Sequence, residues 1–409
     1  MSDSLPPHLD PRGRRRAQGR ARSRGNVARP IGRVVGAALS AGLLVLAGYT
    51  WSTFRNIDSG VTRLQVSVGS KPTSAPQHYN TQDQNILLVG NDDRTNMTPA
   101  ERSALRVGNE TGSKATDTMM IVHIPANGSK ATLISLPRDS YVDIPGFGKN
   151  KLNAAYVFGY GQPKDGATID QRRSAGANLL IQTISNLTGL TIDHYIQVSL
   201  LGFYEISNAI GGVPITLCAD VDDTYAHNQQ TGVGGGSGFK MTKGRHVIQG
   251  VQALEFVRQR HNFPGDREDL DRVRRQQYFL TAAFRQVASV GILFKLKALG
   301  DAVKRNIYLD PGLNLIDLAH QMENLSANNI SGRTIPTTNA TSPGGLSILA
   351  VNPAQVRRFI DSVINPPSAS SSSSTAAKPS TSAKPSTSAP ASGSASSSAP
   401  DAIDSKCIY

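Results

Sequence analysis

Cysteine and histidine are scarce in this chain, and neither shows the spacing of a metal centre. There are two cysteines and eight histidines among 409 residues. A Cys/His metal site needs ligands repeated at short, regular intervals, and the sequence contains no such cluster. It also lacks the G-x-S-x-G motif that presents the nucleophile of α/β-hydrolases. The chemistry of the chain must therefore come from other residue types.

Acidic residues are rare at the N-terminal end. Residues 1–33 contain nine arginines and only two acids, Asp3 and Asp10, a net charge of +7 out of the total of +13. The high pI is therefore largely a property of this tail. We do not take it as a sign of a nucleic-acid-binding protein, although a basic tail can contact nucleic acid.

An uncharged apolar stretch separates Arg33 from Arg55. About 20 residues of helix cross a bilayer core, and Tyr49 and Trp51 suit the interfacial aromatic belt. The basic flank and the apolar run are both longer than in a cleaved signal peptide. We therefore predict a transmembrane helix over 34–54, with the tail in the cytoplasm and the rest of the chain outside.

Composition divides the remainder of the chain into three parts. Residues 55–84 are polar and predict a stalk, whereas 85–365 have globular patterning. Residues 366–409 are rich in Ser, Ala and Pro, with AKPSTS at 377–382 and again at 383–388. Such a segment cannot bury enough apolar surface to fold, and we expect it to be disordered or extended. It either threads a polymer matrix such as a cell wall or serves as a spacer.

The two cysteines, Cys218 and Cys407, stand on either side of the division between the globular part and its tail. Outside the membrane a disulfide between them is permitted, and it would staple the terminus to the domain. Two free thiols are the alternative.

Charged residues follow the first three apolar runs of the globular part, NILLVG, TMMIVHI and ATLISLP, each of which predicts a strand. If these strands form an antiparallel meander, five charged residues fall on one edge of the sheet: Asp92, Arg94, Asp117, Arg138 and Asp139. Two carboxylates beside arginines suit a hard divalent cation that shares phosphate ligands. Any one of these residues alone could instead cap a loop.

The segment 256–277, FVRQRHNFPGDREDLDRVRRQQ, concentrates arginine inside a folded domain. Guanidinium groups match phosphate oxygens two at a time. A helix from Asp269 would place Asp269, Arg272 and Gln276 on one face. Arg258 and Arg260 share a side only if the chain runs extended there. The pattern indicates an anion site; a solvated helix with internal ion pairs is the alternative.

Helical and strand patterns alternate through the rest of the globular part. Helices are expected after Lys151, at 177–187 and 250–257, from Asp269 to about Val287, and at 296–303, 314–325 and 353–363. A further strand, helix and strand flank the Gly–Gly turn of HYIQVSLLGFYEISNAIGGVPITL. Together these predict an α/β domain with a central mixed β-sheet flanked by helices. Apolar residues in 168–190 and 270–290 could line a pocket or simply form the core.

These segments together resemble the LytR–CpsA–Psr (LCP) family of membrane-anchored cell-wall enzymes. The matching motifs run in order through the globular part: LLVGNDDR (87–94), TDTMMIVHI (116–124), ISLPRDSYVDIPG (134–146), KLNAAYVFG (151–159), DHYIQVSLLGF (193–203), AIGGVPI (209–215), GVQALEFVRQR and DLDRVRRQQYFL (250–280). The order of basic tail, span, domain and Ser/Pro-rich end is similar to that of actinobacterial members.

The resemblance implies a phosphotransferase. Such enzymes take a glycopolymer carried on a polyprenyl (pyro)phosphate and join it to peptidoglycan through a phosphodiester, with Mg²⁺ (or Mn²⁺) at the mouth of a lipid pocket. The implied partners are the lipid-linked glycan, peptidoglycan and the membrane, with no nucleic acid. Arabinogalactan is the polymer expected from the actinobacterial character of the chain.

The same resemblance implies roles for residues of this sequence. Asp92 and Asp117 would hold the metal, and an arginine clamp would hold the pyrophosphate: Arg94, Arg138, Arg258, Arg260 and Arg272. Arg275 and Gln276 would bind substrate. Lys151 would contact phosphate or acceptor, or lie on the surface. Asp269 would orient or deprotonate the sugar hydroxyl, or pair with Arg272 or Arg258.

Two other function classes remain open at this level. The same site could hydrolyse a polyprenyl pyrophosphate with water as the acceptor. Alternatively, the domain could bind the lipid carrier, or regulate, without turnover. Phosphate release that needs no acceptor would indicate the hydrolase, and binding that survives every arginine substitution would indicate the binding module.

Overall fold

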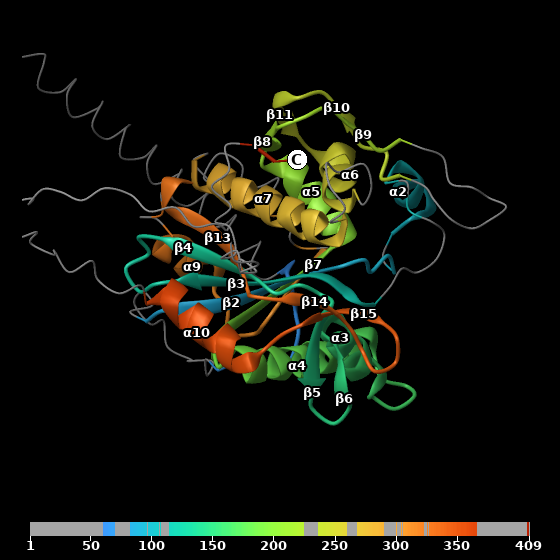
Figure 1. Ribbon diagram of the computed structural model, residues 1–409, viewed down its shortest axis with the longest axis vertical. Coiled ribbons are helices and arrows are strands. Elements are labelled where there is room, and N and C mark those ends of the chain that lie inside the picture. Colours follow the sequence, from blue (N-terminus) through green and yellow to red (C-terminus); the bar gives the residue numbers. More distant parts are fainter. Residues whose placement is uncertain are drawn as a thin grey trace, which may run out of the picture. The chain divides into compact units, whose positions relative to one another are not determined.

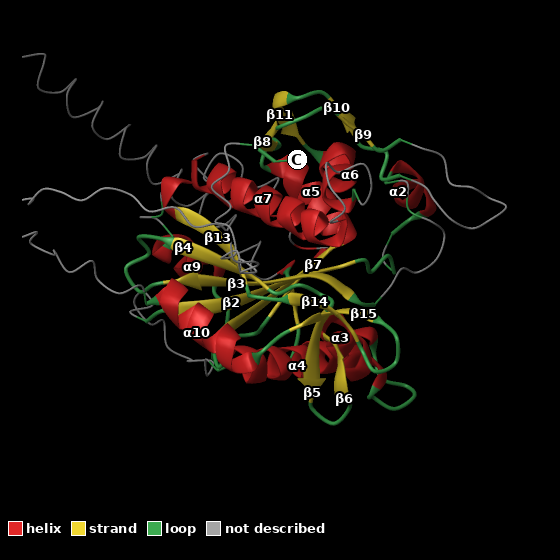
Figure 2. Cartoon of the chain, in the orientation of Figure 1, coloured by secondary structure: helices red, strands yellow, loops and turns green. Residues whose placement is uncertain are grey.

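A seven-stranded mixed sheet organises the molecule (Figures 1 and 2). The structure is a computed structural model that describes residues 60–69, 82–95, 97–105, 107, 114–224, 236–259, 268–289, 300, 304, 306–322, 325, 327–365 and 407–408. All of them belong to the compact unit formed by residues 53–409. The predicted transmembrane segment 34–54 lies outside them, and within the described ranges no helix is long and apolar enough to cross a membrane.

The sheet contains the predicted antiparallel meander at its centre. Its strands, in spatial order, are β1 (Thr62–Arg63), β12 (Ile307–Leu309), β7 (His194–Ser199), β2 (Gln84–Asn91), β3 (Thr116–Ile124), β4 (Ala131–Ser135) and β13 (Ile330–Thr334). β3 is antiparallel to both β2 and β4. β2 is parallel to β7, and β4 is parallel to β13. The predicted α/β class with a mixed sheet is confirmed.

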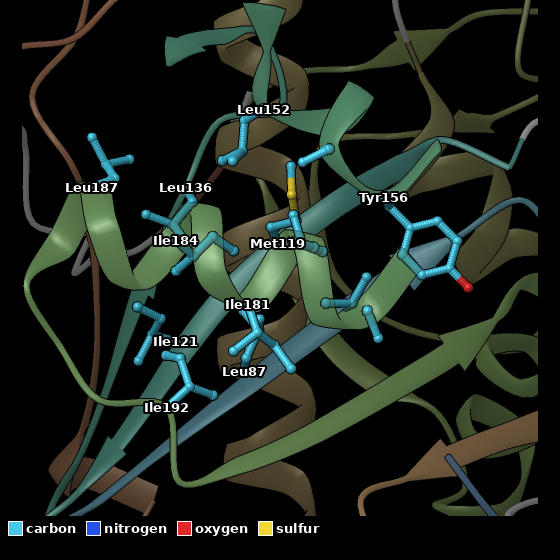
Figure 3. Packing of buried hydrophobic residues seen from close by; sticks show 14 of the residues in the cluster. Leu87, Met119, Ile121, Leu136, Leu152, Tyr156, Ile181, Ile184, Leu187 and Ile192 are labelled. Carbon is cyan, nitrogen blue, oxygen red and sulfur yellow. The ribbon is translucent and has the colours of Figure 1, made fainter. Parts of the chain in front are cut away.

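Helices cover the two faces of this sheet separately. Alternate residues of a strand point to opposite faces. On one face, Leu87 of β2 packs with Ile184 of α4 (Ile169–Thr188) and Tyr156 of α3 (Leu152–Gly161), as Figure 3 shows. On the other face, Ile86 and its neighbours pack with Leu280 of α7 (Glu268–Ser289) and with α9 (Leu315–Gln321).

This arrangement corrects one expectation. Segments 168–190 and 270–290 were both candidates to line a single apolar pocket. They form α4 and α7, which belong to different hydrophobic clusters on opposite faces of the sheet (Figure 1). The strands of the central sheet carry apolar residues on both faces, so α4 covers the apolar residues of one face and α7 covers those of the other. A pocket between sheet and helices can therefore involve α7 or α4, but not both.

Glycine allows α3 and α4 to approach closely. A Cβ on Gly159 would lie 2.5 Å from the carbonyl oxygen of Ala175, and one on Gly176 would lie 2.8 Å from that of Tyr156. Both separations are shorter than real Cβ contacts allow. A capping box at Thr168 and Gln171 begins α4, and Gly189 in the left-handed region ends it.

A second layer of strands lies beside the α3–α4 pair. Its four-stranded sheet has the order β14 (Thr338–Thr341), β15 (Ser347–Ala350), β5 (Ser140–Ile144) and β6 (Gly148–Lys151). The sequence patterns did not predict these short strands, which form two local antiparallel pairs joined by the long-range parallel pairing of β15 with β5. Helix α10 (Pro353–Ile364), which was predicted, packs against α4.

A separate small core carries the disulfide. It includes α5 (Leu200–Ala209), α6 (Gly250–Arg258), part of α7, and two hairpins formed by β8 (Val213–Leu217) with β11 (Gly244–Ile248) and by β9 (Val221–Asp222) with β10 (Lys240–Met241). The structure joins Cys218 to Cys407 with 5.2 Å between their Cα atoms. Ile408 then pairs with Leu217 and is buried in this core. Ile408 thus lies alongside the end of β8.

Two further short elements complete the described part of the chain, α2 (Pro99–Ala104) and η2 (Ala327–Asn329). The strand, helix and strand around the Gly–Gly turn are confirmed as β7, α5 and β8, with Gly211 and Gly212 at φ 79° and 87°. Only glycine adopts such values readily. The helix expected at 296–303 lies almost entirely outside the described residues.

Candidate active site

Charged side chains meet at one edge of the central sheet, where β2 ends, β3 begins and β4 has just ended. Arg138 donates to Asp117 at 2.7 Å and, through Nε, to Asp139 at 3.2 Å. The ammonium group of Lys151 lies 2.8 Å from the other oxygen of Asp139. Of the five charged residues predicted to converge, Asp117, Arg138 and Asp139 form a row of alternating charge that Lys151 completes.

Asp139 and Lys151 are held within this row and do not extend freely into solvent. Burial opposes ionisation of Asp139, but hydrogen bonds and charges from Lys151 and Arg138 outweigh it and lower the pKa of Asp139. Lys151 is therefore an ion-paired member of the edge, since its side chain is only 27% exposed. Three successive ion pairs connect its ammonium group to Asp117.

A β-bulge places Asp117. Gly90 pairs with Thr118, and Asn91 pairs with Thr116, so Asp117 is the extra residue between them on β3. Bulges re-aim a side chain and are frequent beside active sites. The carboxylate of Asp117 is 41% exposed, the most open of the acidic groups in the row. It is the group best placed to meet a ligand.

The segment after β2 sends its side chains two ways. Asp92 accepts from Arg94 through both carboxylate oxygens, one of them at 2.8 Å, and both side chains remain partly exposed. Asp93 between them is buried and contacts Lys114 at 2.8 Å and Arg173 of α4 at 3.0 Å. Alternation of this kind is expected of an extended segment.

The sequence analysis did not single out Asp93, Lys114 or Arg173. Burial alone would raise the pKa of Asp93, but hydrogen bonds from Lys114, Thr95 and Arg173 lower it to about 2. The available signal was the pair of adjacent aspartates in NDDR. Two neighbouring residues of an extended segment cannot both face the same site.

Helix α7 reaches this edge through Gln276. Its side-chain oxygen accepts from the hydroxyl of Thr118 at 3.3 Å, and its amide nitrogen donates to the carbonyl of Val257 at 3.3 Å. Gln276 therefore joins α7 to β3 and to the end of α6. Arg272, one turn earlier on the same helix, is 4% exposed. The predicted common face of Arg272 and Gln276 is consistent with this placement.

Helix α6 ends at Arg258, one residue beyond the predicted segment 250–257. Gln259 has φ −54° and ψ 132°, so the chain leaves the helix there. Arg258 lies partly buried, with a guanidinium nitrogen 3.5 Å from the carbonyl oxygen of Leu105. Arg260 lies outside the described residues. Asp269 belongs to α7, but its side chain is not described.

Arg275 occupies the interior. Its guanidinium donates to the side-chain oxygen of Gln259 and stacks 4.9 Å from the ring of Phe256 and 6.0 Å from that of Phe239. It is fully buried, and burial lowers the pKa of Arg275 to about 10, which leaves it charged at neutral pH. The expected contact of Arg275 with substrate is therefore replaced here by an internal contact. Arg274 instead fits the alternative of a solvated helix face with internal ion pairs. Its side chain is 44% exposed, and a guanidinium nitrogen lies 3.6 Å from a carboxylate oxygen of Asp271.

The acidic side chains at this edge limit the kind of Mg²⁺ site that can form there. In the described part of the chain, no group of three or more His, Cys, Asp and Glu side chains could hold a metal ion. Asp92 and Asp117 remain a pair of carboxylates at the same sheet edge. Mg²⁺ is commonly bound by one or two carboxylates together with substrate phosphates and water. The residues fit that kind of site, in which the substrate supplies ligands.

Comparison with known proteins assigns the class. A model of the LytR_cpsA_psr family matches residues 53–363, so the chain belongs to the LytR–CpsA–Psr family. It is 34% identical over 357 residues to the cell wall biosynthesis protein LcpA of Corynebacterium glutamicum, covering 82% of this chain and 66% of that one. It is 30% identical over 282 residues to the polyisoprenyl-teichoic acid–peptidoglycan teichoic acid transferase TagU of Oceanobacillus iheyensis, covering 68% and 76%.

Solved structures agree on the fold. A Streptococcus agalactiae protein superposes with a TM-score of 0.54 at 22% identity, covering 69% of this chain and 88% of that one. Bacillus subtilis TagV superposes with a TM-score of 0.51 at 19% identity, covering 69% and 98%. The chain spans 66% and 53% of the lengths of the two Corynebacterium relatives LcpA and LcpB.

Proposed function

We propose that this protein is a Mg²⁺-dependent phosphotransferase that joins a polyprenyl pyrophosphate-linked glycopolymer to peptidoglycan. The observation that carries the proposal is the presence of two ion pairs, Asp92–Arg94 and Asp117–Arg138, at the sheet edge where the end of β2 pairs with the start of β3. The activity for which the TagU relative is named, transfer of teichoic acid from a polyisoprenyl carrier to peptidoglycan, is of this class.

The reaction needs positioning and charge stabilisation more than a covalent protein group. The acceptor hydroxyl oxygen forms a bond to the phosphorus attached to the glycan. The bond from that phosphorus to the bridging oxygen of the polyprenyl phosphate breaks, and the lipid phosphate leaves with the electron pair. The hydroxyl proton passes to a base, and we assign Asp269 to that role; an ion pair with Arg272 or Arg258 is its alternative role.

Guanidinium groups would stabilise the charge on the phosphates. We assign the clamp to Arg94, Arg138, Arg258, Arg260 and Arg272, assisted by Gln276. Arg275 is left out because its guanidinium is buried against Gln259 and two aromatic rings. Lys151 neutralises Asp139 at the acceptor end of the row.

Asp92 and Asp117 would hold the metal. A bound Mg²⁺ would bridge phosphate oxygens and reduce their negative charge. Asp92 already gives both of its oxygens to Arg94. Arg94 and a metal therefore compete for this carboxylate, and a metal there would free the guanidinium of Arg94 for phosphate.

The lipid chain would lie on the α7 side of the sheet. Gln276 brings α7 to the charged edge, and the apolar residues behind it on this face are only partly buried: Leu88, Ile196, Leu280, Phe284 and Leu318. Burial of such residues against a prenyl chain would contribute about 25 cal/mol per Å² of apolar area.

We further propose arabinogalactan as the glycopolymer and the outer face of the cell membrane as the location. The similarity to a Corynebacterium cell wall biosynthesis protein supports the first. The disulfide supports the second, because such bonds persist in oxidising compartments. The basic tail and apolar stretch before residue 55 agree with a single-pass anchor.

A transfer assay tests the proposal. The protein is incubated with a polyprenyl pyrophosphate-linked glycan and peptidoglycan, with and without EDTA. Covalent attachment that requires both acceptor and Mg²⁺ is the expected result. Phosphate release of equal rate without peptidoglycan would instead identify a hydrolase, and tight donor binding with no product would identify a carrier-binding module. Parallel donors carrying arabinogalactan or teichoic acid fragments decide the polymer.

A further inference from the structure

A buried ion pair lies directly behind the segment that carries Asp92 and Arg94. Asp93 is 6% exposed and Arg173 is 4% exposed. The two are joined at 3.0 Å, although 80 residues separate them in the chain. Asp93 belongs to the loop after β2, whereas Arg173 belongs to the first turns of α4 on the other side of that loop.

Arg173 is itself fixed from three directions. Besides Asp93, it donates to Asp170 at 2.9 Å, and its guanidinium carbon lies 4.4 Å from the centre of the Tyr308 ring. A planar guanidinium held by two carboxylates and a ring has little rotational freedom. Its position is therefore as well defined as that of the helix that bears it.

Asp93 is held on every side as well. Its first carboxylate oxygen accepts from the ammonium group of Lys114 at 2.8 Å and from the backbone N–H of Thr95 at 3.0 Å. Its second oxygen accepts from Arg173. These contacts tie the backbone at Asp93 to α4, while the side chains of Asp92 and Arg94 on either side of it bond to each other and not to Arg173.

We propose that Arg173 is a positioning residue: through its buried pair with Asp93 it fixes the loop that presents Asp92 and Arg94 to the donor pyrophosphate. The inference rests on the proposed function for its substrate. Arg173 touches neither the sheet-edge row nor, on this assignment, the reacting atoms. Its effect on catalysis is transmitted through one backbone segment, and misplacement by about 1 Å costs as much as 10²-fold in rate.

The test measures binding and turnover separately. Arg173→Met keeps the length of the side chain and removes the charge. Arg173→Lys keeps the charge. Asp170→Asn is the matched control, because it removes the second partner of Arg173, 55% exposed, and leaves the pair with Asp93 intact. Geranyl pyrophosphate with Mg²⁺ is the soluble probe, titrated calorimetrically below the lowest melting temperature of the set.

Arg173→Met is expected to raise Kd for geranyl pyrophosphate by about tenfold or more, with a binding stoichiometry near that of the unaltered protein. Its kcat is expected to fall by about 10²-fold. Arg173→Lys should recover part of both losses, and Asp170→Asn should match the unaltered protein.

A role in folding alone gives a different pattern. Partial unfolding lowers the stoichiometry and leaves Kd unchanged, and that result for Arg173→Met would overturn the inference, as would unchanged Kd and kcat in a fully folded variant. If Arg173→Met does not fold, Lys114→Met is the second variant. Lys114 is the other cation that contacts Asp93, and its side chain is 23% exposed. Its Kd, stoichiometry and kcat then decide whether the Asp93 anchor positions the loop. Failure of the unaltered protein to bind the probe or transfer glycan would refute the proposed function instead.

Discussion

Two segments of the molecule carry arginines that we assign to the phosphate clamp, and they are anchored in opposite ways. In Asp92–Asp93–Arg94, the buried middle residue is an anion held by cations from α4 and from the loop before β3. In the segment that begins at Arg258, the buried residue Gln259 is neutral, and its partner Arg275 of α7 is the charged one. The first anchor, Asp93 with Lys114 and Arg173, therefore joins opposite charges. The second anchor, Gln259 with Arg275, joins a neutral amide to a charged group.

This difference decides which substitutions lower the free energy of unfolding most. Removing one member of a buried charged pair leaves an uncompensated charge, whereas removing a neutral partner leaves an unsatisfied hydrogen-bonding group. The supporting cores also differ. Asp93 follows β2 of the central sheet and contacts Arg173 of α4. Arg275 lies against Phe239 and Phe256 in the small core that the disulfide closes.

The largest effect is expected for Asp93→Leu. The substitution leaves Arg173 buried with only its outer partner Asp170 and should lower the free energy of unfolding by about 3–5 kcal/mol. Urea unfolding measures it. Asp222→Asn is the control, because Asp222 pairs with Lys240 on the surface and its loss should leave the midpoint unchanged. Equal midpoints for Asp93→Leu and the unaltered protein would show that the Asp93 anchor contributes no stability.

Opening the disulfide should loosen only one of the two anchors. Cys407→Ser is expected to lower the free energy of unfolding by about 2–5 kcal/mol, because it releases a long loop in the unfolded chain. Hydrogen exchange should become faster in β8 and α6, which share the small core with Ile408, and stay slow in β2. Faster exchange of equal size in β2 would show that the two cores are not independent.

Both segments are expected to serve one clamp despite their different anchors. Arg94→Ala and Arg258→Ala should each lower kcat for transfer by about 10²–10³-fold, the typical loss when one charge-stabilising donor is removed. Arg245→Ala, on the exposed side of β11, is the matched control and should leave kcat unchanged. A normal kcat for either variant removes that segment from the clamp.

The sequence predicted the parts of this site that depend on local patterns. Apolar runs bounded by polar turns gave the β2–β3–β4 meander, and the meander alone brought Asp117 beside Arg138. Pro264 and Gly265 suggested a break after α6, and Gln259 is indeed extended.

Both anchors escaped prediction because their partners lie far apart in the chain. Nothing in the surroundings of Arg173 distinguishes it from Arg172, its neighbour on the helix surface, until α4 is docked against the sheet. Arg275 was assigned to substrate for a related reason. Charge marks a residue as important, but only packing shows whether it faces the ligand or the core.

A smaller effect is expected at the second anchor. Gln259→Leu removes the side-chain acceptor of a buried guanidinium and should lower the free energy of unfolding by about 1.5–3 kcal/mol. Arg275→Met removes the charge along with the donor and fills similar space, so the double variant should recover stability relative to Gln259→Leu. A double-mutant cycle in urea measures the coupling. Additive losses would mean that the contact between Gln259 and Arg275 contributes nothing of its own.

Lowering the pH should remove the stability contributed by the Asp93 anchor but not that contributed by the Gln259 anchor. The expected change in the free energy of unfolding is slightly smaller than that of the preceding substitution. The pKa of Asp93 is about 2 in the folded protein, below the 3.8 of a free carboxyl group. A lowered pKa contributes stability that is complete above the unfolded value and is lost as pH falls from about 4 to 2, about 2 kcal/mol in total. Asp93→Asn should therefore flatten the acid limb of stability, measured by urea unfolding between pH 2 and 6. Gln259→Leu removes no titrating group and should lower the curve without changing its slope there. Parallel acid limbs for Asp93→Asn and the unaltered protein would mean that Asp93 is not held by its charge, and the contrast between the two anchors would fail.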